Sequence, residues 1–421
     1  MIINRTLNNG IRMVMEKLPA VQSVSVGIWV KAGSVDEEPV NSGISHLIEH
    51  MMFKGTEKRS AKQIAEDVDR IGGHMNAFTG KEATCYYIKT LQNSIDKACD
   101  ILIDMFLNSK FDPEELLKEK DVIYEEIKMI EDNPEDHAGE LLLEMVFRGT
   151  SLQRPIIGTR ESLEGISRDM ILDYIAREYT TDSIVISVAG NFDADYVYHL
   201  FDSKLPGIKT SKEKKAGQGA TYIPSYQVRV KDVEQSHICM GVKGVPQEDK
   251  LYYPMILLNS IVGGSMSSRL FQKIREEKGL AYSVYSGCNS YVTDGIYSIY
   301  AGVSHSKVED AIEAIAEEMR LIKEKGIDEE ELAIAKEQMK SSYVFAQENV
   351  NNRMYANGKN TLLLSRLLTT QEIIDKIDGV EMDALSEAAS IIADMDRYSV
   401  VLISKKDYDI HSKFNDLKEQ M

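Results

Sequence analysis

The most informative segment of this chain reads Gly43-Ile-Ser-His46-Leu-Ile-Glu49-His50-Met-Met-Phe-Lys-Gly55. Its apolar residues recur with the spacing of an amphipathic helix, which Gly55 is expected to end. At about 100° per residue, His46 and His50 lie about 40° apart on this helix, and Glu49 lies about 60° to the other side of His46. All three side chains therefore project from one face within a single turn.

Side chains of these types in this arrangement suit hydrolytic metal chemistry. Two imidazoles at positions i and i+4 can bind one metal ion, and a carboxylate beside them can take a proton from an attacking water. The order His-x-x-Glu-His is the inverse of the common zinc-protease helix motif. The alternative is two surface histidines beside an unrelated glutamate, but the motif lies among apolar residues rather than on a charged face.

A catalytic zinc ion needs a third protein ligand. That ligand should be a His or an acid that reaches the motif from another element. A helix is expected over residues 113–131, because Asp112 can cap it, Pro113 suits its first position and acidic residues follow, and this helix offers several candidates. The residues alone do not choose among its glutamates, which are Glu114, Glu115, Glu119, Glu125, Glu126 and Glu131. Glu119 and Glu126 share one helix face, where one could bind the metal while the other orients a ligand.

These residues resemble the pitrilysin/insulinase family of zinc metallopeptidases, especially its short branch that includes mitochondrial processing peptidase. His46-x-x-Glu49-His50 is followed by Glu126 at the spacing typical of that family. The resemblance implies that His46, His50 and Glu126 bind one Zn²⁺ per chain. It also implies that Glu49 is the general base and that Glu119 supports catalysis.

The resemblance extends well beyond the metal motif. It includes Gly72-Gly73-x-x-Asn76-Ala77, Arg154-Pro155-Ile-Ile-Gly158-Thr159 and Tyr179-Thr180. In the family, the strand at Asn76, Ala77 and Phe78 docks an extended peptide at a sheet edge, where backbone hydrogen bonds give affinity with little demand on sequence. The alternative interpretation is a buried strand that starts after a Gly-Gly turn.

The second half of the chain repeats the plan of the first. Asp328-Glu-Glu-Glu-Leu332 matches Asp112-Pro-Glu-Glu-Leu116 at an offset of about 216 residues, which indicates duplication. We expect an α+β fold of two homologous α/β halves, each an antiparallel or mixed sheet flanked by helices. The expected domains are a metal-binding catalytic domain at 1–205, a polar linker at 206–222, and a degenerate repeat at 223–421 that contributes substrate-binding residues.

This degenerate half is not expected to hold a metal ion of its own. At the repeat offset, Glu119 corresponds to Ala335 and Glu126 corresponds to Ser342. No His-x-x-Glu-His occurs after residue 200. The resemblance instead assigns Arg275 and Tyr282 to the substrate. The tyrosine would donate to the oxyanion and the arginine would bind a backbone carbonyl. From the residues alone, Arg275 is an ordinary cation near a helix end.

The resemblance implies a zinc-dependent endopeptidase that cleaves extended peptides or unfolded segments, as a processing peptidase does. Long members of the family enclose a chamber with four such repeats, and short members pair two chains to do so. Because this chain carries both the metal motif and the Arg275–Tyr282 segment, we expect a homodimer whose halves face one another across a cavity. The alternative is a non-catalytic peptide-binding or assembly subunit of the same fold, which typically lacks metal ligands.

Composition limits the partners and the compartment. The 421 residues include 49 Lys and Arg against 67 Asp and Glu, and this net charge of −18 disfavours nucleic acid as a partner. No stretch approaches the ~18 apolar residues of a membrane span, and no apolar signal segment is visible. Four scattered cysteines without a Cys-x-x-Cys pair fit a reducing compartment. We therefore expect a protein of the bacterial or archaeal cytoplasm without a membrane partner.

Overall fold

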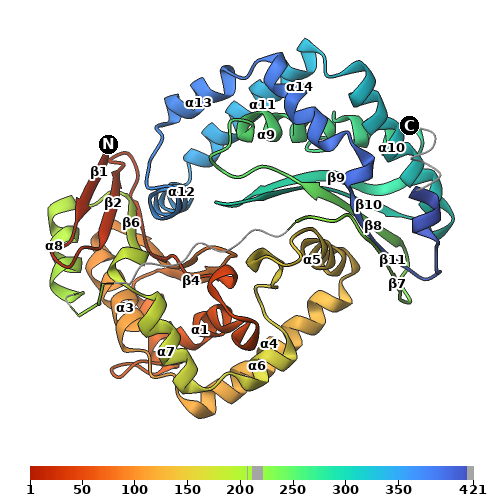
Figure 1. Cartoon of the computed structure of the whole chain (residues 1–421). Coiled ribbons are helices and arrows are strands. Elements are labelled where there is room, and N and C mark those ends of the chain that lie inside the picture. Colours follow the sequence, from red (N-terminus) through yellow and green to blue (C-terminus); the bar gives the residue numbers. More distant parts are fainter. Residues whose placement is uncertain (206, 211–220, 415–421) are drawn as a thin grey trace. The chain divides into compact units, whose positions relative to one another are not determined.

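The computed structural model describes residues 1–205, 207–210 and 221–414. They form two sheets, each flanked by helices, which confirms the expected α+β class (Figure 1). Two compact units are present. The first takes in residues 1–128, the described part of 154–217, and 345–367. The second takes in residues 129–153, the described part of 218–344, and 368–414.

Six strands form the mixed sheet of the first unit, in the order β1-β2-β6-β3-β5-β4. β2 and β6 run parallel, and every other neighbouring pair is antiparallel. The central strands β3 and β6 are buried along almost their whole length, as expected of strands covered on both faces. The strands are β1 (Ile2–Thr6), β2 (Arg12–Lys17), β3 (Ser23–Val30), β4 (His74–Thr79), β5 (Thr84–Leu91) and β6 (Ile184–Gly190).

Helices from distant parts of the sequence cover both faces of this sheet (Figure 1). α1 packs on β4 and β5, and α3 packs on β5, while α12 lies against β2, β3 and β6. The predicted helix over 113–131 is confirmed as α4. The helices are α1 (Ile44–Met52), α2 (Ala61–Arg70), α3 (Ile95–Asn108), α4 (Pro113–Asp132), α6 (Arg160–Gly165), α7 (Arg168–Glu178), α8 (Ala194–Lys204) and α12 (Val350–Leu363).

α12 belongs to the second half of the sequence, yet specific contacts seat it on the first sheet. A Cβ at Gly358 would lie 2.2 Å from the Trp29 Nε1 atom, so only glycine lets the helix approach the indole this closely. On β2, the buried Glu16 carboxylate accepts hydrogen bonds from the side chains of Arg353 and Asn357. Close packing and a paired buried charge therefore both specify this position of α12.

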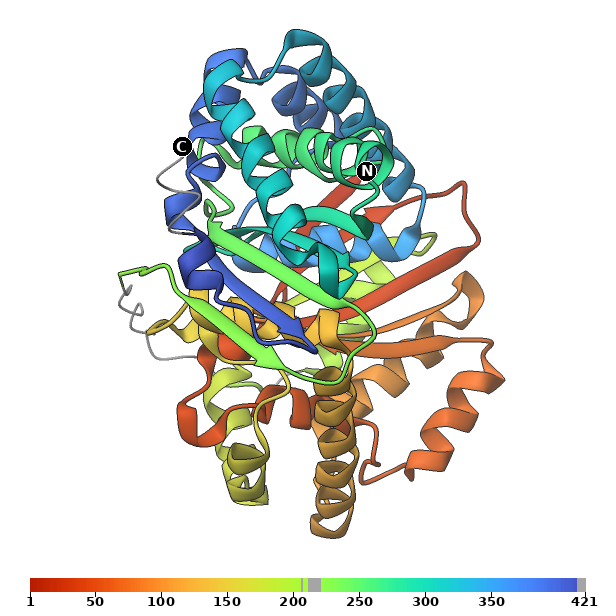
Figure 2. The same cartoon turned by 90° about the vertical axis from the view of Figure 1, so that its right-hand side faces the viewer.

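The second unit holds a five-stranded sheet in the order β7-β11-β8-β10-β9. β11 runs parallel to β7 and antiparallel to β8, and Figure 2 shows it (blue) between these two green strands. The strands are β7 (Tyr226–Val230), β8 (Ser236–Lys243), β9 (Ala281–Ser290), β10 (Gly295–Val303) and β11 (Ser399–Ser404). The helices are α5 (Pro134–Val146), α9 (Tyr252–Val262), α10 (Val308–Lys325), α11 (Glu329–Gln347), α13 (Thr370–Asp378) and α14 (Met382–Ile392).

The two units exchange one helix each. α5 belongs to the first half of the sequence and packs on β8 and β11 of the second unit, just as α12 packs on the first sheet. Most of the linker expected at 206–222 lies outside the described residues. The expected domain limits at 205 and 223 stay a prediction.

Candidate metal centre

α1 and α4 bring the three predicted metal ligands together. The Glu126 Oε2 atom lies 3.9 Å from His46 Nε2 and 3.6 Å from His50 Nε2. One donor atom from each residue lies within 4.8 Å of the others, and no other such group of His, Cys, Asp or Glu occurs among the described residues. A tetrahedral zinc ion with bonds of about 2.1 Å separates its donors by about 3.4 Å. The chemistry and spacing of the donor set therefore fit zinc.

Glu119 lies behind His50, on the side away from this cluster. Its Oε2 atom lies 3.0 Å from His50 Nδ1, so a proton on Nδ1 leaves the lone pair of Nε2 directed toward Glu126. The other oxygen, Oε1, lies 2.6 Å from the Lys54 ammonium. Glu119 thus occupies the orienting position that the sequence allowed for it. The contact with Lys54 was not predicted, because this residue lies beyond the end of α1.

Glu49 lies beside the cluster without joining it. Its Oε2 atom accepts a hydrogen bond of 2.5 Å from the hydroxyl of Thr79, the last residue of β4. Burial raises the pKa of Glu49, and the Thr79 hydroxyl and His50 oppose this effect only in part. A carboxylate with a raised pKa next to three metal donors has the properties of a general base. Thr79 is a second residue that the sequence did not single out.

His46 is held as a neutral imidazole. Burial, and then the neighbouring His50, lower its pKa to about 4. Its Nδ1 atom is buried and has no hydrogen-bond partner among the described residues. Since metal ions bind the neutral form of histidine, His46 is in the protonation state that a metal site requires.

The start of α1 is fixed by two features of its N-terminus. Gly43 has φ = 90°, and a Cβ there would lie 2.6 Å from the Ile157 carbonyl oxygen, so the position requires glycine. The buried Glu37 carboxylate accepts hydrogen bonds from the backbone N–H groups of Gly43 at 2.8 Å and Ser45 at 2.9 Å. These acceptors satisfy donors that a helix leaves unpaired at its start. The helix ends at Met52, before Gly55.

β4 carries the predicted peptide-docking residues Asn76, Ala77 and Phe78. Within the described part of the chain it pairs with β5 alone, so it is an edge strand rather than a buried one. Phe78 is 38% exposed and makes an edge-to-face contact with Trp29 at 5.4 Å between ring centroids. An open strand edge is what docking would require, and the docking role itself stays a prediction.

Arg275 and Tyr282 lie close together in the second unit. The Arg275 guanidinium is 5.4 Å from the centre of the Tyr282 ring, and the tyrosine is 76% exposed. The pairing of β9 with β10 shifts register here, because Gly302 pairs with Ser283 and Val303 with Ala281. Tyr282 is the extra residue of this bulge, a device that redirects a side chain away from the sheet. The roles of both residues toward a substrate stay predictions.

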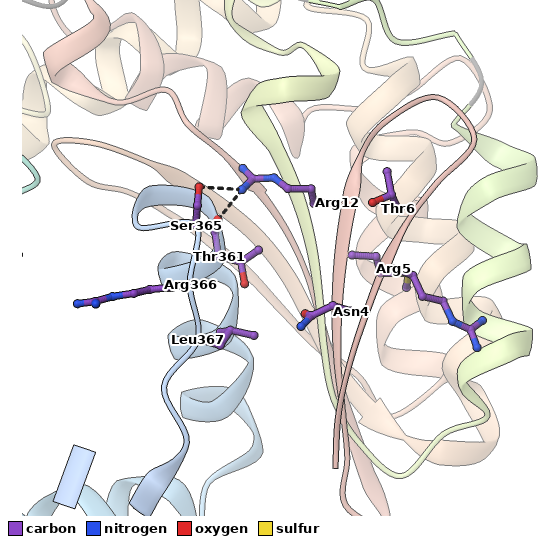
Figure 3. Close-up of a pocket in the computed structure, with 9 residues that line it drawn as sticks. Asn4, Arg5, Thr6, Arg12, Thr361, Ser365, Arg366 and Leu367 are labelled. Atoms are coloured by element: carbon purple, nitrogen blue, oxygen red, sulfur yellow. Dashed lines mark hydrogen bonds between the residues drawn. The ribbon is translucent and has the colours of Figure 1, made fainter. Parts of the chain in front are cut away.

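A separate pocket of about 370 Å³ lies in the first unit, between the β1–β2 hairpin and the end of α12 (Figure 3). Arg12 points toward α12, where its Nη1 atom donates to the Thr361 carbonyl at 2.7 Å and to the Ser365 hydroxyl at 3.3 Å. Arg5 points away from it and pairs with Asp195. Because its cations do not converge and no predicted site residue lines it, this pocket is not part of the metal centre.

Comparison with known protein families identifies both halves of the chain. Residues 12–160 match the family model described as "Insulinase (Peptidase family M16)", and residues 165–339 match "Peptidase M16 inactive domain". The chain is 44% identical over 405 residues to the uncharacterised zinc protease YmxG of Bacillus subtilis, covering 96% of this chain and 98% of that protein. Within the described residues, no helix combines the length and apolar character needed to cross a bilayer.

Solved structures show the same fold at lower identity. A crystal structure of a protease from Helicobacter pylori matches with a TM-score of 0.88 at 21% identity, covering 96% of this chain and 99% of that one. A chain of complex III2 from Candida albicans matches with a TM-score of 0.84 at 21% identity, covering 99% and 100%. At this level of identity, the matches establish the fold alone.

Proposed function

Because this chain belongs to the insulinase family of M16 peptidases, we propose that it is a zinc-dependent endopeptidase that cleaves extended peptides or unfolded segments. The convergence of His46, His50 and Glu126, with Glu49 beside them, carries the proposal. The name of the Bacillus subtilis relative supports zinc as the metal. A processing role, in which the enzyme trims larger chains, is part of the same proposal.

The residues of the site divide the work of hydrolysis. His46, His50 and Glu126 would hold one zinc ion per chain, which when bound polarises the scissile carbonyl and acidifies the attacking water. Glu49 takes the proton of the attacking water and then delivers it to the leaving amine. Glu119 keeps His50 in the required orientation.

Substrate binding is assigned to both units. We propose that an extended peptide adds to the open edge of β4 at Asn76, Ala77 and Phe78, which supplies affinity through the backbone. We further propose that Tyr282 donates to the oxyanion and that Arg275 binds a backbone carbonyl. The exposure of Tyr282 at the bulge of β9 supports its assignment.

Peptide cleavage by the wild type and by Glu49→Gln, with zinc content measured on both, tests the function. We expect Glu49→Gln to keep its zinc and to lose at least about a hundredfold in kcat, since general bases contribute 10²–10⁴-fold. Glu125→Gln, an exposed carboxylate beside a ligand on α4, is the matched control and should retain activity. Unchanged turnover in Glu49→Gln would eliminate the base role. Wild type that binds zinc but cleaves no peptide would favour the non-catalytic subunit.

We also propose that the enzyme is a homodimer in which Glu49 of one chain works with Tyr282 of its partner. Each single variant, Glu49→Gln and Tyr282→Phe, should be impaired alone. Mixed dimers would contain one site with both native residues, so that co-refolded variants should recover roughly a quarter of wild-type activity. Size-exclusion chromatography should show the dimer, and an active monomer would refute this arrangement.

A cytoplasmic location in a bacterium completes the proposal. The Bacillus subtilis relative is bacterial, and the four cysteines are free thiols, three of them buried. Unpaired cysteines are typical of a reducing compartment. Fractionation of cells that express the native gene, with a cytoplasmic marker enzyme as the control, tests this location.

A further inference from the structure

Lys54 lies in the turn that follows α1, outside the His-x-x-Glu-His motif. Its backbone N–H donates to the Met51 carbonyl at 3.1 Å, which closes a tight turn directly after the helix. The turn is anchored again two residues later, where the buried Thr56 hydroxyl donates to the Asp104 carboxylate at 2.8 Å. The backbone of Lys54 is therefore held in place, and its side chain extends to Glu119 on α4.

The Glu119 carboxylate has a different partner on each oxygen. Oε1 lies 2.6 Å from the Lys54 ammonium, and Oε2 lies 3.0 Å from His50 Nδ1. Glu119 is only 4% exposed, so water does little to satisfy it. When a buried carboxylate loses one of two such partners, part of its negative charge has no partner. The group can then rotate about its terminal side-chain torsion.

We infer that Lys54 is a positioning residue of the metal centre, which holds Glu119 in the one orientation that receives the His50 N–H. With Oε1 bound to the ammonium, the carboxylate presents Oε2 to the imidazole. The imidazole in turn directs Nε2 toward Glu126, at 3.6 Å from its Oε2 atom. The inference rests on the proposed zinc site, and it adds a cation on which the geometry of that site depends.

Zinc affinity, measured by chelator competition without any peptide, tests this role. Lys54→Met should bind zinc about 10–100-fold more weakly, the usual effect of losing a group that orients a ligand. Lys54→Arg should recover most of the affinity, because a guanidinium can still pair with the carboxylate. Lys58→Met removes the same charge from an exposed position nearby and should stay within about twofold of wild type. Thermal melts report whether each variant is folded.

A double-mutant cycle with Glu119→Gln shows whether Lys54 acts through Glu119. If it does, the double variant binds zinc no more weakly than Glu119→Gln alone. Independent, multiplying effects would overturn the inference, as would a folded Lys54→Met with wild-type affinity. Lys54→Gln replaces the methionine variant in the same cycle if that variant unfolds.

The two proposals fail in different ways. A wild-type protein that binds zinc tightly and cleaves nothing refutes the peptidase but leaves the role of Lys54 in place. An active enzyme whose zinc affinity does not depend on Lys54 refutes only the positioning role. A wild-type protein that does not bind zinc refutes both.

Discussion

The ionisation of Glu37 should lower the stability of this protein as pH rises from about 5 to 7. Burial raises the pKa of Glu37 to about 7, because it penalises the ionised carboxylate by more than the N–H donors of Ser45 and Gly43 favour it. In the unfolded chain the pKa returns to its ordinary 4.5. For an acid whose folded pKa is raised, the stabilising contribution is complete below the unfolded pKa and is lost as pH rises through the folded pKa.

These two pKa values set the size of the effect. Between pH 5 and pH 8, the linkage relation gives a loss of about 2–3 kcal/mol in the free energy of unfolding from this carboxyl group. His46 works in the opposite direction, because its lowered pKa removes stability as pH falls below its ordinary value of 6.5. The pH dependence of the wild type alone is therefore a sum, and a variant is needed to isolate Glu37.

Urea unfolding of the wild type and of Glu37→Gln from pH 5 to pH 8 provides that comparison. Glutamine does not titrate, while every other group, including His46, titrates in both proteins. The stability difference between the two should change by about 2–3 kcal/mol across this range, with the wild type losing more at high pH. Glu38→Gln is the matched control, since Glu38 is exposed, and its curve should run parallel to that of the wild type. A constant difference for Glu37→Gln would refute the reasoning.

Three further predictions concern the site. Thr79→Val should lower kcat about 10–100-fold at unchanged zinc content, because a hydrogen bond to a charged group contributes about 1.5–3 kcal/mol. Thr79→Ser keeps the hydroxyl and should keep most of the activity. Native turnover in the valine variant would contradict the contact with Glu49. Gly43→Ala should lower the free energy of unfolding, measured in urea, by more than about 1 kcal/mol, because φ is positive there and a Cβ has no room. Gly139→Ala is the control. A Cβ at Gly139 in α5 meets open space, so this variant should be neutral or stabilising by up to about 1 kcal/mol. Chelation should abolish cleavage and one equivalent of zinc should restore it, while activity indifferent to chelator would count against a metallopeptidase.

Some elements of the site follow from local sequence. His46, Glu49 and His50 share one helix face because the helical repeat places them there, whatever the rest of the chain does. The start of β4 after Gly72-Gly73 and the start of α4 at Pro113 are likewise specified by neighbouring residues, through the Gly-Gly turn and the Asp-Pro signal. Periodicity, caps and turns act over a few residues, so they can be recognised without a partner.

Other features come from residues far apart in the chain. The sequence offers six glutamates on α4 and does not say which of them meets the histidines. Only the approach of this helix to α1 brings Glu126 to the histidines and Glu119 to Lys54. The same holds for the hydroxyl of Thr79 at Glu49, and for the seating of α5 and α12 on sheets of the opposite half. Local patterns show that a helix has a buried face. They do not show which surface buries it, because that choice depends on the complementary shapes and charges of segments brought together only when the whole chain folds.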